Sequence, residues 1–405
     1  MIKTITGGIC ASKGFRASGI HCGMRRKPGK KDLALIVSEV PATTAAVFTT
    51  NLVKGAPIKV NKEHLKDGIA QAIIINSGIA NTCNANGVEL AESMAKLAAD
   101  YTGVKQDDVL VASTGVIGAE LRMDPIINGM PFLLSQLSDE GSIDACRAIM
   151  TTDTRVKEIA VEFEIQGVPC HLGAIGKGSG MIHPNLATML VFATSDVAIS
   201  HEMLQKALSG DVTSTFNMMS VDGDTSTNDM CVVMANGLAK NPIIDKEGED
   251  FDIFMKALNT VNVYMARSIA GDGEGCTKLL ECVVTGADTE EDAKKVAKSV
   301  ICSSLTKAAM FGEDANWGRI LCAAGYSGAN IDVEKIDLDF KSSAGQVALC
   351  RDGNGIPFSE ELASRVLHER EIDILINLGD GPFKATAWGC DLTYEYVKIN
   401  GEYRS

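Results

Sequence analysis

Residues 173–196 have the types and the order best suited to chemistry. Four glycines fall within eight residues, and the small residue Ala187 stands directly before Thr188, which opens an apolar run. Glycine reaches backbone angles that other residues avoid, and a strained junction lets a hydroxyl attack the carbonyl before it. The order is compatible with a chain that cuts itself before Thr188. It is equally compatible with an ordinary flexible loop that leads into a buried strand.

A cut at this junction would release a nucleophile that carries its own base. The Thr188 hydroxyl would attack a carbonyl while the new α-amino group, whose pKa lies near ~7.7–8.0, takes up the hydroxyl proton. A side-chain base is then unnecessary, so we expect His183 to shape the junction rather than to accept that proton. The apolar run after Thr188 would hold the new N-terminus in a sheet.

Short β-branched runs alternate with helical patterns along the chain and would position this junction. We predict strands at residues 34–38, 71–76, 109–112, 158–165, 189–194, 231–235, 278–285, 336–340, 372–378 and 392–399. Apolar spacing predicts helices at residues 88–101 and 251–269, and cap residues predict further helix starts at Asp124, Ser200, Thr289 and Ser359. The mixture predicts an α/β or α+β protein with layered sheets, whose connectivity this pattern leaves open.

The composition excludes several classes of protein. The 405 residues are 45% hydrophobic, which is enough for a large core and suggests two domains. The net charge of −14 argues against a surface for nucleic acid or anionic membranes. The 12 cysteines are scattered singly, which favours reduced thiols over disulfides, and no signal peptide or membrane span is apparent. We therefore expect a cytoplasmic protein.

The sequence resembles the ornithine acetyltransferases, the glutamate N-acetyltransferases of arginine biosynthesis. The likeness centres on their maturation site, which matches GKGSGMIHPNLATMLVFATSD. It continues in family order through residues 14–15, 32–36, 48–51, 76–78, 113–118, 151–154, 220–229, 271–275 and 312–318. Essentially the whole chain is covered.

The resemblance implies self-cleavage between Ala187 and Thr188. It gives an α chain of residues 1–187 and a β chain of residues 188–405, which stay together and pair as α2β2. The implied fold is an α–β–β–α layered sandwich with a smaller C-terminal lobe.

The resemblance also implies roles for residues that would not stand out alone. It makes Thr114 and Gly115, which follow a predicted strand directly, the oxyanion hole. It also implies that six residues contact the substrate, namely Thr151, Lys177, Thr188, Glu274, Asn400 and Ser405. Without the resemblance, residues 113–118 and 151–154 would be interpreted as turns and the C-terminus as a fraying tail.

Two glycine- or acid-rich strings have other interpretations that we reject. After residues 271–275, Thr277 precedes Lys278, whereas a Walker A phosphate loop has its lysine before the hydroxyl residue. Glu274 would also repel phosphate. Residues 220–229 lack the spacing of an EF-hand and a His or Cys cluster, so they predict a structural turn near the site rather than a metal site.

The implied reaction is a ping-pong transfer of acetyl from N2-acetyl-L-ornithine to L-glutamate through acetyl-Thr188, with no cofactor or metal. Acetyl-CoA as a second acetyl donor stays open, because members with and without that activity share these residues. One alternative is an amidohydrolase or aminopeptidase with the same threonine nucleophile. The other is a non-catalytic amino-acid sensor that keeps the fold.

Overall fold

The computed structural model describes residues 1–25, 29–183 and 189–402. These residues divide into two compact units. Unit 1 contains residues 1–25, 29–178, 189–213 and 225–265, and unit 2 contains residues 179–183, 214–224 and 266–402. Each unit therefore contains residues from both sides of the predicted cleavage junction.

Unit 1 is built on a mixed sheet, which in the described residues has nine strands in the order β1-β6-β7-β8-β9-β3-β4-β5, with β2 paired to β3. The strands are β1 (Lys3–Ile5), β2 (Phe15–Ile20), β3 (Leu33–Phe48), β4 (Ile69–Ile79), β5 (Val109–Val116), β6 (Lys157–Ile165), β7 (Val168–Lys177), β8 (Leu190–Ser195) and β9 (Met230–Ala235). The helices are α1 (Ala56–His64), α2 (Gly87–Thr102), α3 (Met123–Ser135), α4 (Ser142–Ile149) and α5 (His201–Asp211), while α6 (Glu249–Ala270) begins in unit 1 and continues into unit 2.

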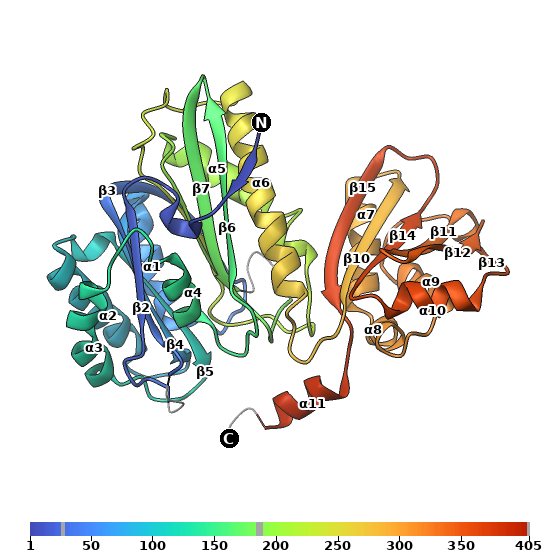
Figure 1. Cartoon of the computed structure of the whole chain (residues 1–405), viewed down its shortest axis with the longest axis horizontal. Helices are drawn as coiled ribbons and strands as arrows, with labels where there is room; N and C mark the ends of the chain where they lie inside the picture. Colours follow the sequence, from blue (N-terminus) through green and yellow to red (C-terminus); the bar gives the residue numbers. More distant parts are fainter. Residues whose placement is uncertain (26–28, 184–188, 403–405) are drawn as a thin grey trace. The chain divides into compact units, whose positions relative to one another are not determined.

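Helices cover both faces of the sheet of unit 1 (Figure 1). Successive residues of a strand point to opposite faces, so each of β3, β4 and β5 contributes side chains to two cores. On one face Leu35 and Ile74 share a core with Met94 of α2 and Met130 of α3. On the other face Ile36 shares a core with residues of α4. Strands buried on both faces need continuous apolar runs, which explains the β-branched runs in the sequence.

Unit 2 is built on a second mixed sheet, which in the described residues has six strands in the order β13-β12-β11-β14-β10-β15. The strands are β10 (Leu279–Ala287), β11 (Asp337–Ser342), β12 (Gly345–Arg351), β13 (Asn354–Gly355), β14 (Glu371–Asn377) and β15 (Phe383–Cys390). The helices are α7 (Glu290–Cys302), α8 (Ser304–Phe311), α9 (Trp317–Gly325), α10 (Glu360–His368) and α11 (Tyr394–Gly401). Helix α7 packs on β10 and β15.

The mixed α/β class predicted from the sequence is confirmed, and every predicted strand except the last overlaps an observed strand. The predicted strand at residues 392–399 is wrong, because this segment forms helix α11. Thr393 caps the helix by accepting a hydrogen bond from Tyr396 N, and Glu395 lies in the first turn. These are helix-start signals, and they outweigh the β-branched and aromatic residues of the segment.

Cap residues predicted three helix starts correctly and one with an error of two residues, since the residue at the cap position of α3 is Arg122 rather than Asp124. Ser200, Thr289 and Ser359 each accept a hydrogen bond from a backbone N–H of the first helical turn. Asp124 is not a cap, because α3 begins at Met123 and Asp124 lies within its first turn. The stacking order of the predicted α–β–β–α layers stays a prediction.

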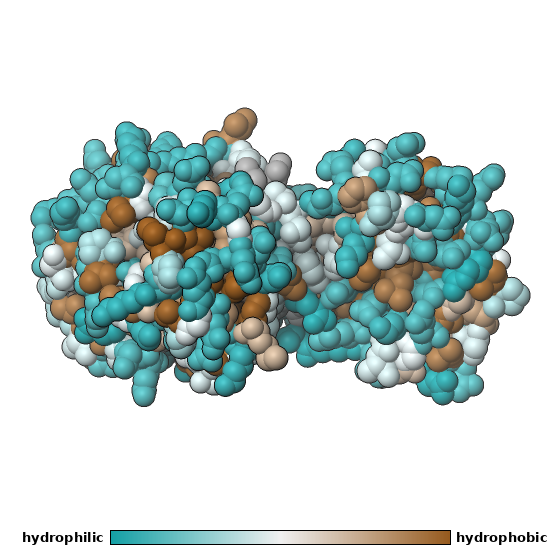
Figure 2. Space-filling model, turned by 90° about the horizontal axis from the view of Figure 1, so that it is seen from above, coloured by the Kyte–Doolittle hydropathy of each residue, from teal (hydrophilic) through white to brown (hydrophobic). Residues whose placement is uncertain are grey.

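The state of the cysteines, the polarity of the surface and the length of the apolar helices can be compared with what the composition predicted. All 12 cysteines are free thiols, as their scattered spacing predicted. Hydrophobic residues lie scattered among hydrophilic ones on the face seen in Figure 2. Across the described ranges, no helix is both long and apolar enough to cross a membrane.

Substitution of Phe192 by alanine should destabilise unit 1 strongly. Phe192 lies on β8, is 0% exposed and belongs to the core that includes α4. The cavity left by Phe192→Ala should lower the free energy of unfolding by about 3–5 kcal/mol in denaturant titrations. Phe132→Ala is the control, because that side chain is 58% exposed and its loss should change the free energy by about 0.5 kcal/mol or less. Equal losses in the two variants would contradict the packing described here.

Candidate functional site

Three strand ends meet at one edge of the sheet of unit 1. β7 runs antiparallel to β8, which places Lys177 opposite Leu190. β9 runs parallel to β8, with Leu190 opposite Met230. The Met230 N–H donates a hydrogen bond of 2.9 Å to Met189 O. The end of β7 and the beginning of β9 therefore flank the beginning of β8.

The predicted junction is continuous with this edge. Ala187 and Thr188 lie outside the described residues. Thr188 is joined by one peptide bond to Met189, which directly precedes β8. In the sequence, the predicted nucleophile is therefore next to the residue that precedes β8.

The side chain of Lys177 is buried beside a hydroxyl that was predicted to form part of an oxyanion hole. Lys177 is 8% exposed and Thr114 is 9% exposed. The Lys177 Nζ donates to Thr114 Oγ1 over 3.4 Å. The structure thus brings together two residues that the sequence places 63 positions apart. A cation next to a hydroxyl donor suits a site where negative charge develops on oxygen.

Gly115, the other predicted oxyanion-hole residue, has a backbone that requires glycine. Thr114 and Gly115 belong to β5 itself, whereas the sequence placed them after the strand. Gly115 has φ +132°, and a Cβ there would lie 2.2 Å from the Gly78 carbonyl carbon on β4. The register of β4 with β5 also shifts at Gly78 and Ile79, which marks a bulge. The close approach of β4 therefore fixes the position of Gly115.

Asp153 organises the surroundings of Lys177, and the sequence analysis missed this role. One Asp153 carboxylate oxygen accepts hydrogen bonds from Lys157 Nζ at 2.7 Å and from Gly178 N at 2.8 Å. The other accepts from the N–H of Thr151 at 2.9 Å. The same buried carboxylate therefore holds the backbone of Thr151 directly and the backbone next to Lys177 through Gly178.

Burial and neighbouring charges shift the pKa values of the buried groups at this edge in different directions. Burial raises the pKa of Asp153, but Lys157 and Lys177 outweigh it and hold the pKa well below its usual value. Burial lowers the pKa of Lys177, against the attraction of Asp153 and Asp229. Burial raises the pKa of Asp229 well above its usual value, and a hydrogen bond from Ser226 and the charge of Lys177 offset only part of this. Asp153 is thus a fixed negative charge, whereas Asp229 favours its protonated form.

Asp229 directly precedes β9, and the sequence analysis included it only in a turn. It is 4% exposed, and within the described residues its Oδ2 has no hydrogen-bond partner. Its backbone O accepts from Thr49 N at 3.0 Å. The neighbouring Asn228 Nδ2 donates to Ser113 O at 2.9 Å, next to Thr114. An acid directly before a predicted strand was the only signal in the sequence, and it did not reveal this burial.

Unit 2 brings together two of the predicted substrate contacts. Asn400 Nδ2 donates to Glu274 Oε2 at 2.8 Å, and Glu274 is 6% exposed. The Glu274 N–H donates to Ser179 O at 2.9 Å. A Cβ at Gly180 would lie 2.4 Å from the Glu274 carboxyl carbon, so this glycine makes room for the glutamate. Ser405 lies outside the described residues.

The turn at residues 220–229 fixes the chain before the junction, as a structural turn should. Asp222 accepts hydrogen bonds from Met181 N at 2.6 Å and from Ile182 N at 2.9 Å. The Tyr396 hydroxyl donates to Asp222 Oδ2 at 3.2 Å. The carboxylate thus holds backbone just upstream of the predicted cut.

His183 is surrounded by groups that keep it neutral. Its Nδ1 lies 3.1 Å from Ser220 Oγ and 3.7 Å from Cys302 Sγ. Burial and the nearby charge of Lys298 lower the pKa of His183 to about 4. Such a histidine is a weak base, and its role in shaping the junction stays a prediction.

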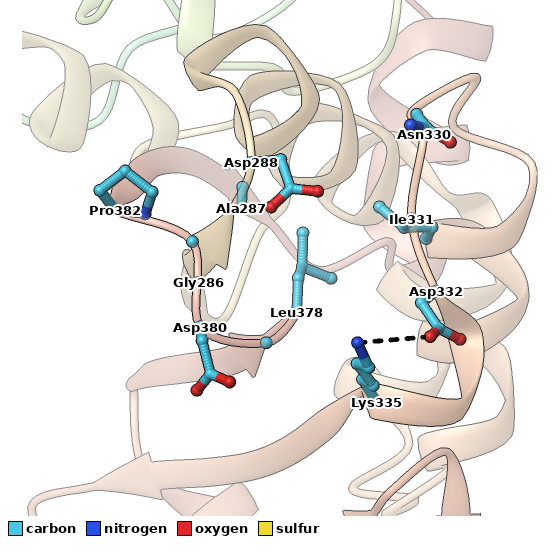
Figure 3. Close-up of a pocket in the computed structure, with 12 residues that line it drawn as sticks. Gly286, Ala287, Asp288, Asn330, Ile331, Asp332, Lys335, Leu378, Asp380 and Pro382 are labelled. Atoms are coloured by element: carbon cyan, nitrogen blue, oxygen red, sulfur yellow. Dashed lines mark ion pairs between the residues drawn. The ribbon is translucent and has the colours of Figure 1, made fainter.

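Unit 2 contains a hollow of about 400 Å³ (Figure 3). Its lining includes Asp288, Asp332, Asp380 and Lys335, and Lys335 pairs with Asp332 over 3.7 Å. No predicted site residue in the described part of the chain lines it. Likewise, no group of three or more His, Cys, Asp or Glu side chains is arranged to hold a metal ion, counting only described residues.

A buried lysine beside a threonine hydroxyl, with a glycine held in a restricted backbone conformation, defines an enzyme-like site on an α/β protein. The ArgJ family profile matches residues 16–405. The "Arginine biosynthesis bifunctional protein ArgJ" of Caldanaerobacter subterraneus is 51% identical over 405 residues, which is 100% of both chains. The chain belongs to the ArgJ family.

Two solved structures share sequence with parts of the chain. One is the arginine biosynthesis bifunctional protein argJ from Bacillus halodurans, with 47% identity and a TM-score of 0.49 over 52% of this chain and 97% of that chain. The other is the ornithine acetyltransferase from Mycobacterium tuberculosis in complex with ornithine, with 34% identity and a TM-score of 0.43 over 46% of this chain and 100% of that chain.

Replacing Asp153 by asparagine should destabilise the protein in a pH-dependent way. Asp153→Asn leaves Lys157, which is 1% exposed, without its buried carboxylate, at a cost of about 3–5 kcal/mol in the free energy of unfolding at pH 7. The folded-state pKa of Asp153 is depressed, so its stabilisation is complete above the unfolded pKa of about 3.9 and disappears as the pH falls further.

Denaturant titrations at neutral and acidic pH would test this. The difference in the free energy of unfolding between wild type and Asp153→Asn should become smaller below about pH 4. Asp100→Asn is the matched control, because Asp100 pairs with Lys96 on the surface and is 57% exposed. The free energy of unfolding of that variant should fall by less than about 1 kcal/mol. A gap of constant size at all pH values would contradict the role given to Asp153.

Proposed function

We propose that this chain transfers the acetyl group of N2-acetyl-L-ornithine to L-glutamate through an acetyl-Thr188 intermediate, in the cytoplasm. The products are L-ornithine and N-acetyl-L-glutamate. As an ArgJ protein the chain is an acyltransferase of arginine biosynthesis. The observation that carries the proposal is the buried pair of Lys177 and Thr114, since it lies in unit 1 with the strand that Thr188 precedes.

We propose that the chain first cuts itself between Ala187 and Thr188. The products would be residues 1–187 and residues 188–405. β8 would then be the first strand of the second fragment, and it is hydrogen-bonded to β7 of the first fragment along residues 190–195. Separating the fragments would break the sheet, which supports a particle that keeps both of them. We further propose that two such particles pair as α2β2.

In the proposed reaction the Thr188 hydroxyl attacks the acetyl carbonyl while the freed α-amino group takes its proton. The Thr114 hydroxyl and the Gly115 N–H stabilise the oxyanion, and the ammonium of Lys177 adds to the field at Thr114 Oγ1. The proton returns to the leaving amine of ornithine. The amine of glutamate then attacks the acetyl ester and restores the hydroxyl.

The substrate roles follow from charge. Thr151 and Lys177 would bind the carboxylate that N-acetylornithine and glutamate share, since a lysine ammonium attracts a carboxylate. Glu274, Asn400 and Ser405 would bind the ammonium groups. No cofactor or metal enters the proposed reaction. The name of the relative from Caldanaerobacter contains the word "bifunctional". We propose acetyl-CoA as a second acetyl donor to glutamate.

Replacing Thr188 by alanine should abolish both the cut and the transfer. Thr188→Ala removes the hydroxyl, so the chain should stay intact and the transfer rate should fall about 10⁴-fold or more. Thr188→Ser keeps a hydroxyl and should keep partial cleavage and activity. A denaturing gel, the intact mass and an assay of N-acetylglutamate formation would measure both effects.

Two results would contradict the proposal. One is transfer at the normal rate by Thr188→Ala. The other is acetate release from acetylornithine that does not depend on glutamate, which would indicate an amidohydrolase. Acetyl-CoA with glutamate, tested on the same preparation, measures the second donor activity.

Glu274→Gln should weaken binding of N-acetylornithine while leaving the fold intact. The loss of one charged contact should raise KM about tenfold or more. Glu395→Gln is the control, because Glu395 is a 54% exposed carboxylate on α11. Steady-state kinetics with varied acetylornithine distinguish the two variants, and an unchanged KM in Glu274→Gln would remove Glu274 from the substrate site.

A further inference from the structure

Two cysteines of unit 2 that are far apart in the sequence have their thiol groups in contact. Cys276 stands in the turn between α6 and β10, and Cys390 is the last residue of β15. A hydrogen bond joins the two side chains. Cys390 is 1% exposed, whereas Cys276 is partly exposed. Unit 2 therefore holds a thiol pair of which one member reaches solvent.

The turn at residues 271–276 packs around both sulfur atoms. Cys276 Sγ lies 3.5 Å from Gly271 O, and the Cys276 N–H donates to Gly273 O over 3.0 Å. A Cβ at Gly273 would lie 2.8 Å from Cys390 Sγ, so a glycine is needed for the turn to approach this sulfur so closely. The backbone of the turn therefore determines where both thiols lie.

The strand that carries Cys390 is fixed as well. Cys390 lies opposite Leu279 in the antiparallel pair of β15 and β10. The next residue, Asp391, accepts hydrogen bonds from the N–H groups of Thr277 at 2.8 Å and Lys278 at 3.0 Å. These bonds attach the end of the turn to the end of β15, so the two cysteines are kept together.

A buried cation contacts the sulfur of Cys390. Lys307 of α8 is 4% exposed, and its Nζ donates to Cys390 Sγ over 3.5 Å and also to Cys390 O. Among the residues that the structure describes, no carboxylate forms an ion pair with Lys307. A buried ammonium is costly without an anion beside it, and a neighbouring lysine favours the thiolate form of a cysteine. The Cys390 sulfur is thus placed to neutralise this charge.

These neighbours divide the pair into a thiolate and a thiol. The hydrogen bond from Cys276 and the charge of Lys307 outweigh burial and lower the pKa of Cys390 to about 7. The hydrogen bond to Cys390, together with burial, raises the pKa of Cys276 above its usual value. Burial without such partners has the opposite effect on Cys282 of β10, whose pKa it raises. A thiolate next to a thiol is the arrangement that disulfide chemistry uses.

We propose that Cys276 and Cys390 are a redox pair, which hydrogen peroxide converts into a disulfide and a dithiol converts back. The observations that carry the proposal are the contact of both sulfurs with one turn and the buried ammonium of Lys307 at Cys390. Peroxide is a small neutral molecule, so it suits a buried thiolate whose neighbour is partly exposed. The pair is separate from acetyl transfer and goes beyond the proposed function.

The atoms and electrons balance over the oxidation. The Cys390 thiolate attacks one oxygen of the peroxide, the S–O bond forms, the O–O bond breaks, and hydroxide leaves a sulfenic acid on Cys390. The Cys276 sulfur then attacks the Cys390 sulfur, the S–S bond forms and the S–O bond breaks. The first hydroxide takes up the proton that Cys390 had released, and the second takes the proton of the Cys276 thiol. Two thiols are oxidised, and one peroxide is reduced to two molecules of water.

The disulfide should disturb the turn that carries Glu274. A covalent bond holds two sulfur atoms closer together than a hydrogen bond does, so one of them must move. Cys390 is held in the sheet of unit 2, which leaves the turn as the part that shifts. Glu274 lies two residues before Cys276 and accepts a hydrogen bond of 2.8 Å from Asn400. Oxidation should therefore weaken binding of N-acetylornithine, a consequence that rests on the proposed function.

The test maps disulfides in the purified full-length protein. Reduced protein would be treated with hydrogen peroxide at neutral pH, its remaining thiols would be alkylated, and tryptic peptides would be analysed by mass spectrometry with and without a dithiol. Trypsin separates Cys276, Cys282 and Cys390 into the peptides 268–278, 279–294 and 385–398.

The expected product is a single linkage between the peptides of Cys276 and Cys390, which the dithiol removes. Cys282, which is 0% exposed, is the internal control and should stay a free thiol in the same digest. The proposal would be overturned if the linkage did not form in the folded protein. Oxidation of Cys282 as fast as Cys390 would overturn it too, since the pair would then have no special reactivity.

Lys307→Met tests the role of the cation. Methionine has a similar length but no charge, so the thiolate fraction of Cys390 at neutral pH should fall, and the rate of oxidation should fall about tenfold for each unit by which the pKa rises. Lys278→Met is the matched control, because Lys278 is a buried lysine of unit 2, 5% exposed, that pairs with Glu313 over 3.2 Å instead. It should be oxidised at the wild-type rate.

Circular dichroism shows whether both lysine variants fold. A wild-type rate of oxidation in folded Lys307→Met, or an equal slowing in Lys278→Met, would contradict the role given to Lys307. If Lys307→Met does not fold, the peptide map of the wild-type protein decides the proposal without it.

Steady-state kinetics distinguish the redox pair from the proposed function. Oxidised wild type should show a KM for N-acetylornithine about tenfold higher, which reduction restores. Cys276→Ser cannot form the disulfide and should keep its KM after peroxide. A mapped disulfide with an unchanged KM would overturn the effect on Glu274. A reduced protein that transfers no acetyl group would contradict the proposed function, whereas the peptide map would still test the redox pair.

Discussion

The position of β8 between two hydrogen-bonded neighbours is the constraint on which the candidate site depends. All six of its side chains are buried, and β7 and β9 pair with it along its whole length. Because the register on both sides is fixed, Lys177 and Met230 have defined places at the beginning of β8. A slip of one residue would turn Phe192 from the core to the opposite face, so the apolar core enforces the geometry of the polar edge.

Charges at this edge are tolerated because they compensate one another. Lys157 and Lys177 are buried cations, and Asp153 accepts a hydrogen bond from the first and attracts the second. An ion in a dry environment is expensive unless it has such partners. Asp229 differs, since its environment favours the neutral acid over the charged one. Two buried aspartates near this edge therefore have pKa values that are shifted in opposite directions.

Sequence patterns predicted elements better than they predicted contacts. Continuous β-branched runs identified the central strands because both faces of the sheet are covered, and polar caps identified three helix starts. The strand at residues 392–399 failed because Thr393 and Glu395 favour a helix there. For the site, family resemblance supplied Thr114, Gly115 and Lys177. It did not supply Asp153 or Asp229, since their importance comes from burial and from neighbours far away in sequence.

A cut before residue 188 would change the kinetic order of folding. The uncut chain can place β8 between β7 and β9 in a unimolecular process, because one covalent chain carries all three strands. After the cut, the same pairing would require two separate molecules to meet, and refolding would depend on concentration. The proposed mature enzyme would then persist through slow unfolding rather than through ready refolding, which is kinetic stability.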